Sequence, residues 1–294
     1  MEQSKSVEIS FHTDTLLFRE AVFYTAKKTG LNPALVEKDY FCSVLLSKLG
    51  SRCEEPPVFR GGTSLSKIHA DFYRLSEDLD FLLSISPTSS RSDRSRRITP
   101  VKEWILSLEK EKSLFKVEQR LTGFNNSKQY VAQVVYPSQI SSGFGRIKFE
   151  VGLREEILTE PITGRARTIL ENPFTDKPCI QEFDLVALTI EETYAEKLRA
   201  ALTRREPAIR DFFDIYYAVF ELGIDMSPII ISILKKKLQV PDNNEIDVSK
   251  ARKKELLSQL ETQLKPVLRS KDYESFDFDK VFGFISDLAV KIKM

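Results

Sequence analysis

The chain has 294 residues, of which 41% are hydrophobic, 10% aromatic and 30% charged. This composition excludes a disordered chain, which has few aromatic residues and a large charge imbalance. Lysine plus arginine (44) and aspartate plus glutamate (43) nearly cancel, so the net charge of +1 indicates no particular class of partner. The length predicts one large domain or two closely associated ones.

The cysteine and histidine content narrows the possible chemistry. Cys42, Cys53 and Cys179 form no C-x-x-C pair, which argues against disulfides and zinc and favours a reduced, cytoplasmic setting. No signal peptide and no apolar run of about 18 residues is present, so we expect neither export nor a membrane partner. The two histidines, His12 and His69, leave little material for Ser-His-Asp chemistry. Carboxylates, lysines and bound ions must therefore carry any reaction.

The first third of the chain reads as two helices and then a strand, turn and helix. Apolar spacing predicts a helix over 14–29, stopped by Gly30, and a second from Asn32-Pro33 to Gly50. A strand over 58–60 then leads through Gly61-Gly62 into a helix over 64–75, and a strand over 76–83 runs into a loop.

The rest divides into a strand region and a helical region. After a basic stretch over 91–102, we expect a helix near 100–112, strands over 129–137 and 145–153, and a loop over 160–178. Helices are predicted over 184–204, 208–222, 227–239, 248–269 and 276–292. The prediction is an α+β fold with one domain over residues 1–180 and a helical domain over 181–294.

The glycine turn is a candidate anion site. A Gly-Gly turn lets the backbone approach a ligand closely, and the free N–H groups of a helix start favour a triphosphate. Hydroxyls and a lysine in the following helix add polar contacts. The alternative is an ordinary tight connection. The predicted nucleotide-binding residues from this region are Gly61, Gly62, Thr63, Ser64, Lys67 and Ser76.

A pair of carboxylates on the next strand is a candidate metal site. Side chains two apart share a strand face, so Asp78 and Asp80 lie side by side and repel each other unless they are solvated or bind a cation. Such ligands suit Mg²⁺, with Mn²⁺ as an alternative ion. Glu150, on the polar face of a later strand, would complete a two-metal site. The alternative is a set of ordinary solvated strand acids.

Several segments together resemble the AbiEii/AbiGii nucleotidyltransferase toxins, relatives of the MenT toxins in the polymerase-beta-like superfamily. The matching segments are residues 36–40 (VEKDY), 59–67 (FRGGTSLSK), 74–80 (RLSEDLD), 195–198 (AEKL) and 204–216. The resemblance implies a nucleotidyltransferase core of mixed sheet with flanking helices, closed over the nucleotide by the C-terminal helices. It also implies that Lys197 contacts the triphosphate and that Asp211 supports the active site. The expected catalytic residues are Asp78, Asp80, Lys197 and Asp211. Without it, Lys197 and Arg204 would read as one solvated helix face.

The basic stretch after the metal strand is a candidate nucleic-acid contact, with a solvated loop as the alternative. Its residues are Arg91, Arg94, Arg96 and Arg97.

The expected reaction is transfer of a nucleoside monophosphate from a nucleoside triphosphate to a hydroxyl of an RNA end, with tRNA as a plausible acceptor. The resemblance implies a toxin–antitoxin or phage-defence role and a separate antitoxin as partner. Protein nucleotidylation and non-catalytic nucleotide binding remain as alternatives.

Overall fold

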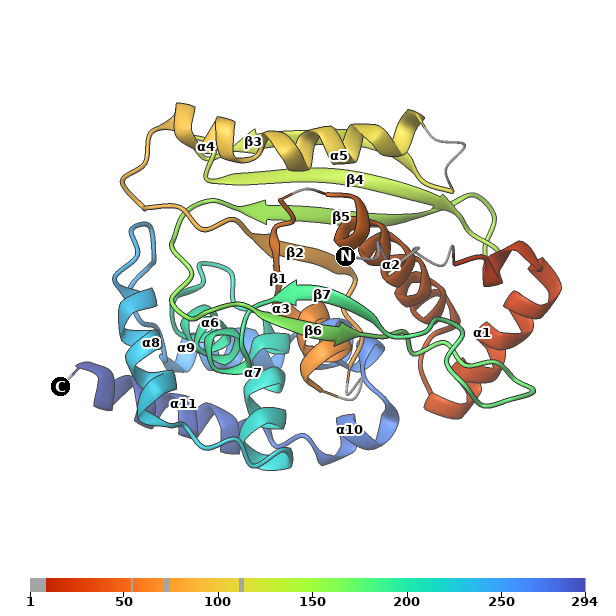
Figure 1. Cartoon of the computed structure of the whole chain (residues 1–294). Helices are drawn as coiled ribbons and strands as arrows, with labels where there is room; N and C mark the ends of the chain where they lie inside the picture. The colour runs from red at the N-terminus through yellow and green to blue at the C-terminus, as the bar shows by residue number, and fades with distance from the viewer. Residues whose placement is uncertain (1–8, 54, 71–73, 111–113, 294) are drawn as a thin grey trace.

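The centre of the molecule is a mixed β-sheet. Its computed structural model describes residues 9–53, 55–70, 74–110 and 114–293. In this part of the chain seven strands lie in the order β3-β4-β5-β2-β1-β7-β6, and the β2–β5 and β1–β7 pairs are parallel while the others are antiparallel (Figure 1). The strands are β1 Val58–Arg60, β2 Asp78–Leu82, β3 Lys116–Phe124, β4 Gln129–Pro137, β5 Phe144–Gly152, β6 Ile162–Ala166 and β7 Phe183–Ala187. The predicted α+β class is confirmed.

The two N-terminal helices form as predicted. Helix α1 (Thr15–Thr29) begins after the Asp14 cap and ends at Gly30, whose φ of 75° is the left-handed conformation that glycine adopts without strain. Helix α2 (Pro33–Arg52) begins where the Asn32 side chain accepts from the Ala34 N–H, and it packs against β5 and β7.

The helix after the glycine turn is shorter than predicted. It consists of α3 (Gly61–Ser64) and a π-helical segment, Leu65–His69, and ends at Ala70 with extended backbone. Arg74 pairs with Leu268 as an isolated antiparallel bridge, so the predicted helix over 64–75 is wrong at its C-terminal end. Residues 71–73 lie outside the described part of the chain.

The basic stretch is helical. Helix α4 (Arg91–Arg97) starts with a capping box between Ser90 and Asp93, and α5 (Thr99–Lys110) follows it. Both lie beside β3 and β4 in Figure 1. The alternative of a solvated loop is therefore wrong, because two reciprocal hydrogen bonds close the first turn of α4.

Three strands were not expected. Strand β3 lies at one edge of the sheet and buries only Leu121 fully, so it lacks an apolar alternation. Strand β6 falls within the expected loop over 160–178. Strand β7 occupies the start of the predicted helix over 184–204, and the true helix, α6 (Ile190–Thr203), begins after the Thr189 cap.

The C-terminal region is helical. Its helices are α7 Ile209–Tyr216, α8 Pro228–Leu238, α9 Lys250–Leu257, α10 Ser270–Ser275 and α11 Phe278–Lys293. The predicted helix over 248–269 is interrupted, because α9 ends at Leu257 and is followed by π-helical (Leu260–Leu264) and 3₁₀ (Lys265–Val267) segments.

The buried side chains form two clusters. One lies between the sheet and helices α1, α2 and α5, and the other lies among α6, α7, α8 and α11. This arrangement supports a second structural unit after β7, and the boundary near residue 180 stays a prediction. No helix in the described part is long and apolar enough to cross a membrane.

Candidate active site

A cavity of about 760 Å³ lies where the sheet meets the C-terminal helices. Its floor is a row of residues across three strands, since Asp80 on β2 is opposite Arg60 on β1 and opposite Glu150 on β5. The predicted site residues that line it are Gly61, Asp80, Glu150, Lys197 and Asp211. The structure therefore brings together five residues from distant parts of the sequence.

The glycine turn is packed directly against the carboxylate strand. Gly61 has a φ of 80°, and a Cβ built on it would lie 2.8 Å from the Asp80 Oδ2 atom. A Cβ on Gly62 would lie 2.3 Å from the Arg74 Nη2 atom and 3.2 Å from the Ser76 hydroxyl oxygen. Gly61 is thus required by close approach and by backbone conformation, and Gly62 by close approach alone.

The two aspartates on β2 share one face, as predicted. Among the described residues, neither side chain has a hydrogen bond or an ion pair. Burial and, after it, the negative charge of Glu150 raise the pKa of Asp80 to about 6, against the opposing effect of Arg60. Asp80 is therefore a carboxylate whose charge the surrounding protein does not fully balance.

Glu150 differs from the aspartates because both of its oxygens are occupied. Oε1 accepts a hydrogen bond from Gln129 Nε2 at 2.7 Å, and Oε2 lies 2.7 Å from Lys148 Nζ. Accordingly, no group of three His, Cys, Asp or Glu side chains in the described residues is arranged to hold a metal ion. Asp78 and Asp80 suit a hard divalent cation by donor type and shared face, whereas Glu150 is held by the protein.

Lys197 projects from α6 into the cavity and is held by two acids of α7. Its Nζ lies 2.9 Å from Asp211 Oδ1 and 2.8 Å from Asp214 Oδ2. Burial lowers the pKa of Lys197, but the two aspartates outweigh it and the pKa is raised. Asp214 also receives two hydrogen bonds from Arg74, at 2.5 and 2.8 Å. Lys197 is consequently kept as an ammonium in a fixed position.

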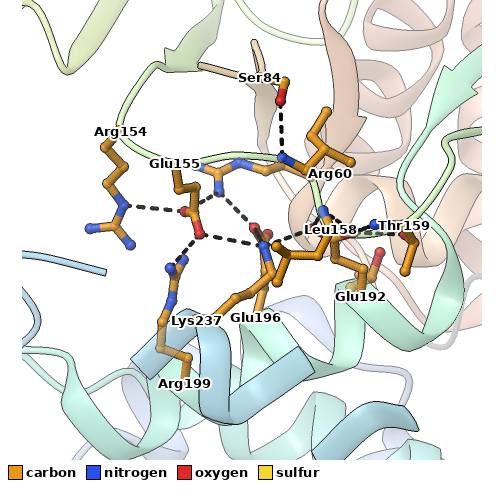
Figure 2. A network of polar contacts seen from close by, with 12 residues as sticks. Arg60, Ser84, Arg154, Glu155, Leu158, Thr159, Glu192, Glu196, Arg199 and Lys237 are labelled. Atoms are coloured by element: carbon orange, nitrogen blue, oxygen red, sulfur yellow. Dashed lines mark hydrogen bonds and ion pairs between the residues drawn. The ribbon is translucent and has the colours of Figure 1, made fainter. Parts of the chain in front are cut away.

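A second charged network adjoins the cavity, and Figure 2 shows its contacts. Lys237 of α8 is fully buried, and its Nζ lies 2.8 Å from Glu192, 3.1 Å from Glu196 and 3.4 Å from Glu155. Arg60 joins it, with Nη1 3.1 Å from Glu196 Oε1. The network thus connects β1 of the sheet to α6 and α8.

Two further contacts extend this network to the segment after β5. Arg199 donates to Glu155 at 2.7 Å, and Glu192 accepts from the backbone N–H groups of Leu158 and Thr159 at 2.8–3.1 Å. Each buried carboxylate therefore has partners within the chain. No pattern in the sequence indicates this network, because Lys237 stands in the run Lys235-Lys236-Lys237 and would be taken for a solvated residue.

Some predicted nucleotide contacts lie outside the cavity lining. Lys67 is fully buried, and its Nζ lies 2.5 Å from Asp39 Oδ1 and 2.6 Å from the Ser43 hydroxyl oxygen, which makes it a structural cation. Thr63 donates to the backbone carbonyl of Asp78 at 2.5 Å. Gly62, Ser64 and Ser76 are likewise absent from the cavity wall, as is Asp78.

The arginines of α4 have different environments. Arg94 is buried and donates to the carbonyls of Leu153 and Pro87, both at 3.0 Å, so it holds the fold together. Arg96 pairs with Asp93 at the surface, and Arg97 pairs with Glu55. Arg91 is exposed. None of the four lines the cavity.

The cavity contains cations that the sequence did not single out. A lysine in the turn before β4 and arginines on β1, on the segment after β5, on α6 and just beyond α6 contribute to its wall. These residues are Arg60, Lys128, Arg154, Arg199 and Arg205. Only their convergence in space identifies them, since they come from four separate parts of the chain.

Comparison with known proteins identifies the family. Residues 45–283 match the family described as "Nucleotidyl transferase AbiEii toxin, Type IV TA system". The chain belongs to this family. It is a nucleotidyltransferase toxin of the type IV toxin–antitoxin class, as the resemblance in its motifs predicted.

Solved structures agree with this assignment at the level of the fold. JHP933 from Helicobacter pylori superposes with a TM-score of 0.51 at 16% identity, covering 89% of this chain and 93% of that one. The nucleotidyltransferase toxin MenT4 from Mycobacterium tuberculosis also gives 0.51 at 16% identity, covering 93% and 98%. A comparison with curated proteins gives no significant match.

Proposed function

We propose that this AbiEii toxin transfers a nucleoside monophosphate from a nucleoside triphosphate to a hydroxyl of an RNA end, with tRNA as the leading candidate. The observation that carries the proposal is the shared cavity of Asp80 and Lys197. A carboxylate whose pKa is raised to about 6 suits a cation, and an ammonium in the same cavity suits a polyphosphate. A nucleoside triphosphate bound with a divalent ion supplies both the cation and the polyphosphate.

Asp80, on the floor of the cavity, and Asp78, beside it on the same face of β2, are the residues that would hold magnesium or manganese. When bound there, the ion supplies charge neutralisation for the α-phosphate and the leaving pyrophosphate. The glycine turn contributes differently. Gly61 lines the cavity and keeps its backbone free of a side chain beside Asp80, so a phosphate can approach closely.

Lys197 is proposed to bind the triphosphate. An ammonium has three donors, and Asp211 and Asp214 take two of them, which leaves one for a phosphate oxygen. Asp211 and Asp214 also fix the direction of the Lys197 side chain. They are therefore positioning residues in this proposal, whereas Lys67 is left out because it is buried against Asp39.

The rim of the cavity favours a nucleic-acid acceptor. Arg204 and Arg205 are exposed at the end of α6 and line the cavity, and Lys128 and Arg154 lie on the wall as well. Exposed cations beside a phosphate-transfer site suit the phosphates of an RNA end. A protein hydroxyl as acceptor and simple nucleotide binding without transfer are the competing functions. A type IV toxin also implies a cognate antitoxin.

The test is transfer of label from each of the four α-³²P nucleoside triphosphates in the presence of Mg²⁺, with total RNA and with nucleic-acid-free protein extract in separate reactions. We expect labelled RNA and unlabelled protein. Label only in protein would establish the alternative acceptor. Label in neither, with nucleotide bound, would establish a non-catalytic regulator and overturn the proposal.

The double variant Arg96→Ala, Arg97→Ala tests the contribution of α4 to RNA binding. We expect weaker RNA affinity at low salt and unchanged nucleotide affinity, because contacts to phosphates depend steeply on ionic strength. Equal RNA affinity at low salt would limit these arginines to their surface pairs with Asp93 and Glu55.

A further inference from the structure

Two neighbouring strands present four charged side chains on one face of the sheet. In the parallel pairing of β2 with β5, Asp78 is opposite Lys148 and Asp80 is opposite Glu150. The alternate residues of β5, including Phe149, are fully buried on the opposite face. One lysine is therefore built into the group of three carboxylates, at a position fixed by strand register.

Lys148 makes a direct ion pair inside this group. Its Nζ is 2.7 Å from Glu150 Oε2, and the Glu150 side chain is only 18% exposed. Gln129 from β4 donates to the other oxygen of Glu150 at 2.7 Å. A carboxylate with both oxygens held by protein donors must give up one of these partners before it can bind a second ion.

We infer that Lys148 supplies the second positive charge of the active site, so that the toxin binds one divalent ion at Asp78 and Asp80 and Glu150 anchors Lys148. This inference rests on the proposed function and deepens it. It replaces the two-ion site expected from three carboxylates. An ammonium 2.7 Å from a carboxylate balances one negative charge, as a second ion would. The remaining pair, Asp78 and Asp80, is enough for one ion that keeps several waters and substrate oxygens as its other ligands.

The experiment counts bound manganese in the full-length protein by equilibrium dialysis, without nucleotide and with the α,β-methylene analogues of the four nucleoside triphosphates. Because manganese–nucleotide complexes are present on both sides of the membrane, the excess on the protein side is the bound ion. We expect one ion per wild-type chain. Two ions per wild-type chain would overturn the inference.

Lys148→Gln should create a second manganese site, with one additional ion per chain. The reason is that Glu150 loses its ammonium while its carboxylate stays beside Asp80. Lys148→Arg should keep one ion, because it retains the charge. If Lys148→Gln still binds one ion and transfers label as wild type does, Lys148 is an ordinary surface partner of Glu150 and the inference is wrong.

Arg146→Gln is the matched control. Arg146 lies two residues before Lys148 on β5 and makes its own ion pair with Glu118 at 2.8 Å, outside the group of carboxylates. It should bind one ion, as wild type does, and melt within a few degrees of wild type. A second ion in both Lys148→Gln and Arg146→Gln would show a general charge effect and would overturn the inference.

Failure of the inference can be told apart from failure of the proposed function with Asp80→Asn. If this variant loses the single manganese of the wild type, the ion is at the proposed site, and only the number of ions decides the role of Lys148. If Asp80→Asn binds manganese as wild type does, the ion lies elsewhere and the proposed function itself loses its metal site.

Discussion

Two groups of acids lie on either side of Arg60 and behave in opposite ways. The sheet cluster is Asp78, Asp80 and Glu150, and the helix cluster is Glu155, Glu192 and Glu196. In the helix cluster, burial raises the pKa of Glu196, but Arg60, Lys237 and Arg199 outweigh burial and lower it far below its usual value. In the sheet cluster the pKa of Asp80 is raised to about 6.

The difference shows how to separate structural acids from functional ones. Every carboxylate of the helix cluster is within 3.1 Å of a buried or half-buried cation or of backbone N–H donors. The carboxylates of such a cluster have their charge balanced by groups of the chain itself. Asp80 is opposite another acid, Glu150, in the strand register, and it lines the cavity. The positive charge that balances Asp80 therefore has to come from a ligand.

The largest expected effect is on catalysis in the sheet cluster. Asp80→Asn keeps the shape of the side chain and removes one of the charges proposed to hold the ion. Since a bound metal contributes several kcal/mol to transition-state stabilisation, transfer should fall by about 10³-fold. Label transfer measures this, and the circular dichroism spectrum should stay that of wild type. Full metal-dependent transfer by the variant would remove Asp80 from the site.

The next effect is on stability and belongs to the helix cluster. Lys237→Met leaves Glu155, Glu192 and Glu196 with fewer cations in a buried place, which should lower the free energy of unfolding by about 3 kcal/mol. Urea denaturation measures it. Lys236→Met is the matched control, because Lys236 is the exposed neighbour on the same helix and should cost little. Equal losses in the two variants would mean that the network contributes nothing specific.

Lys197 joins the two regions, because it lies on α6 and lines the cavity. Lys197→Met should weaken binding of the nucleoside triphosphate about tenfold or more, since a charge-assisted hydrogen bond to phosphate contributes roughly 1.5–3 kcal/mol. Calorimetric titration with a non-hydrolysable analogue checks this. Lys38→Met, which loses an ion pair with Glu77 away from the cavity, should bind the analogue as wild type does.

The smallest effect concerns the pH dependence of stability. The pKa of Asp80 is about 6 in the folded protein, above the ordinary value of 3.8. The folded state therefore binds the proton more readily, and its stability falls as pH rises from about 4 to 6. Asp80→Asn removes this loss of stability. The metal-free variant should therefore be more stable than metal-free wild type at pH 7.5, by about 1 kcal/mol once the pKa shift is discounted for solvent screening.

That gain should shrink towards zero as the pH falls below 4, where Asp80 becomes protonated in the unfolded state as well as in the folded state. Melting temperatures of the metal-free proteins at the two pH values test it. Asp184→Asn is the control, because this exposed strand acid pairs with Arg165 and should gain nothing. A less stable Asp80→Asn at pH 7.5 would indicate a structural ion pair at Asp80.

Local patterns in the sequence were sufficient for the features that depend on neighbours along the chain. The two-residue period placed Asp78 and Asp80 on one strand face, and Asn32 and Gly30 marked helix ends where the structure has them. The glycine turn was also predicted, because a turn that needs glycine shows directly as glycine in the sequence. The roles assigned to these residues stay predictions.

Features that depend on distant partners could not be predicted in this way. Residues 183–187 form a strand because they pair with both β1 and β6, whereas their sequence, FDLVA, reads equally well as the first turn of a helix. Lys237 looks like a surface lysine until α8 packs against α6. The Lys148–Glu150 pair could have been predicted, since both residues share a face of one strand. Only the register with β2 shows that the pair lies beside Asp78 and Asp80.

The place of β7 in the sheet has a consequence for when the toxin becomes active during its synthesis. Phe59 on β1 is paired with Ala187 on β7, so the sheet cannot close until the ribosome has released the chain well beyond residue 187. The wall of the cavity comes later still, because α6 and the lining residues Asp242, Asn243 and Asn244 follow β7. Pairing over such sequence separations is slow to form. We expect a nascent toxin to remain inactive until most of its chain has been made.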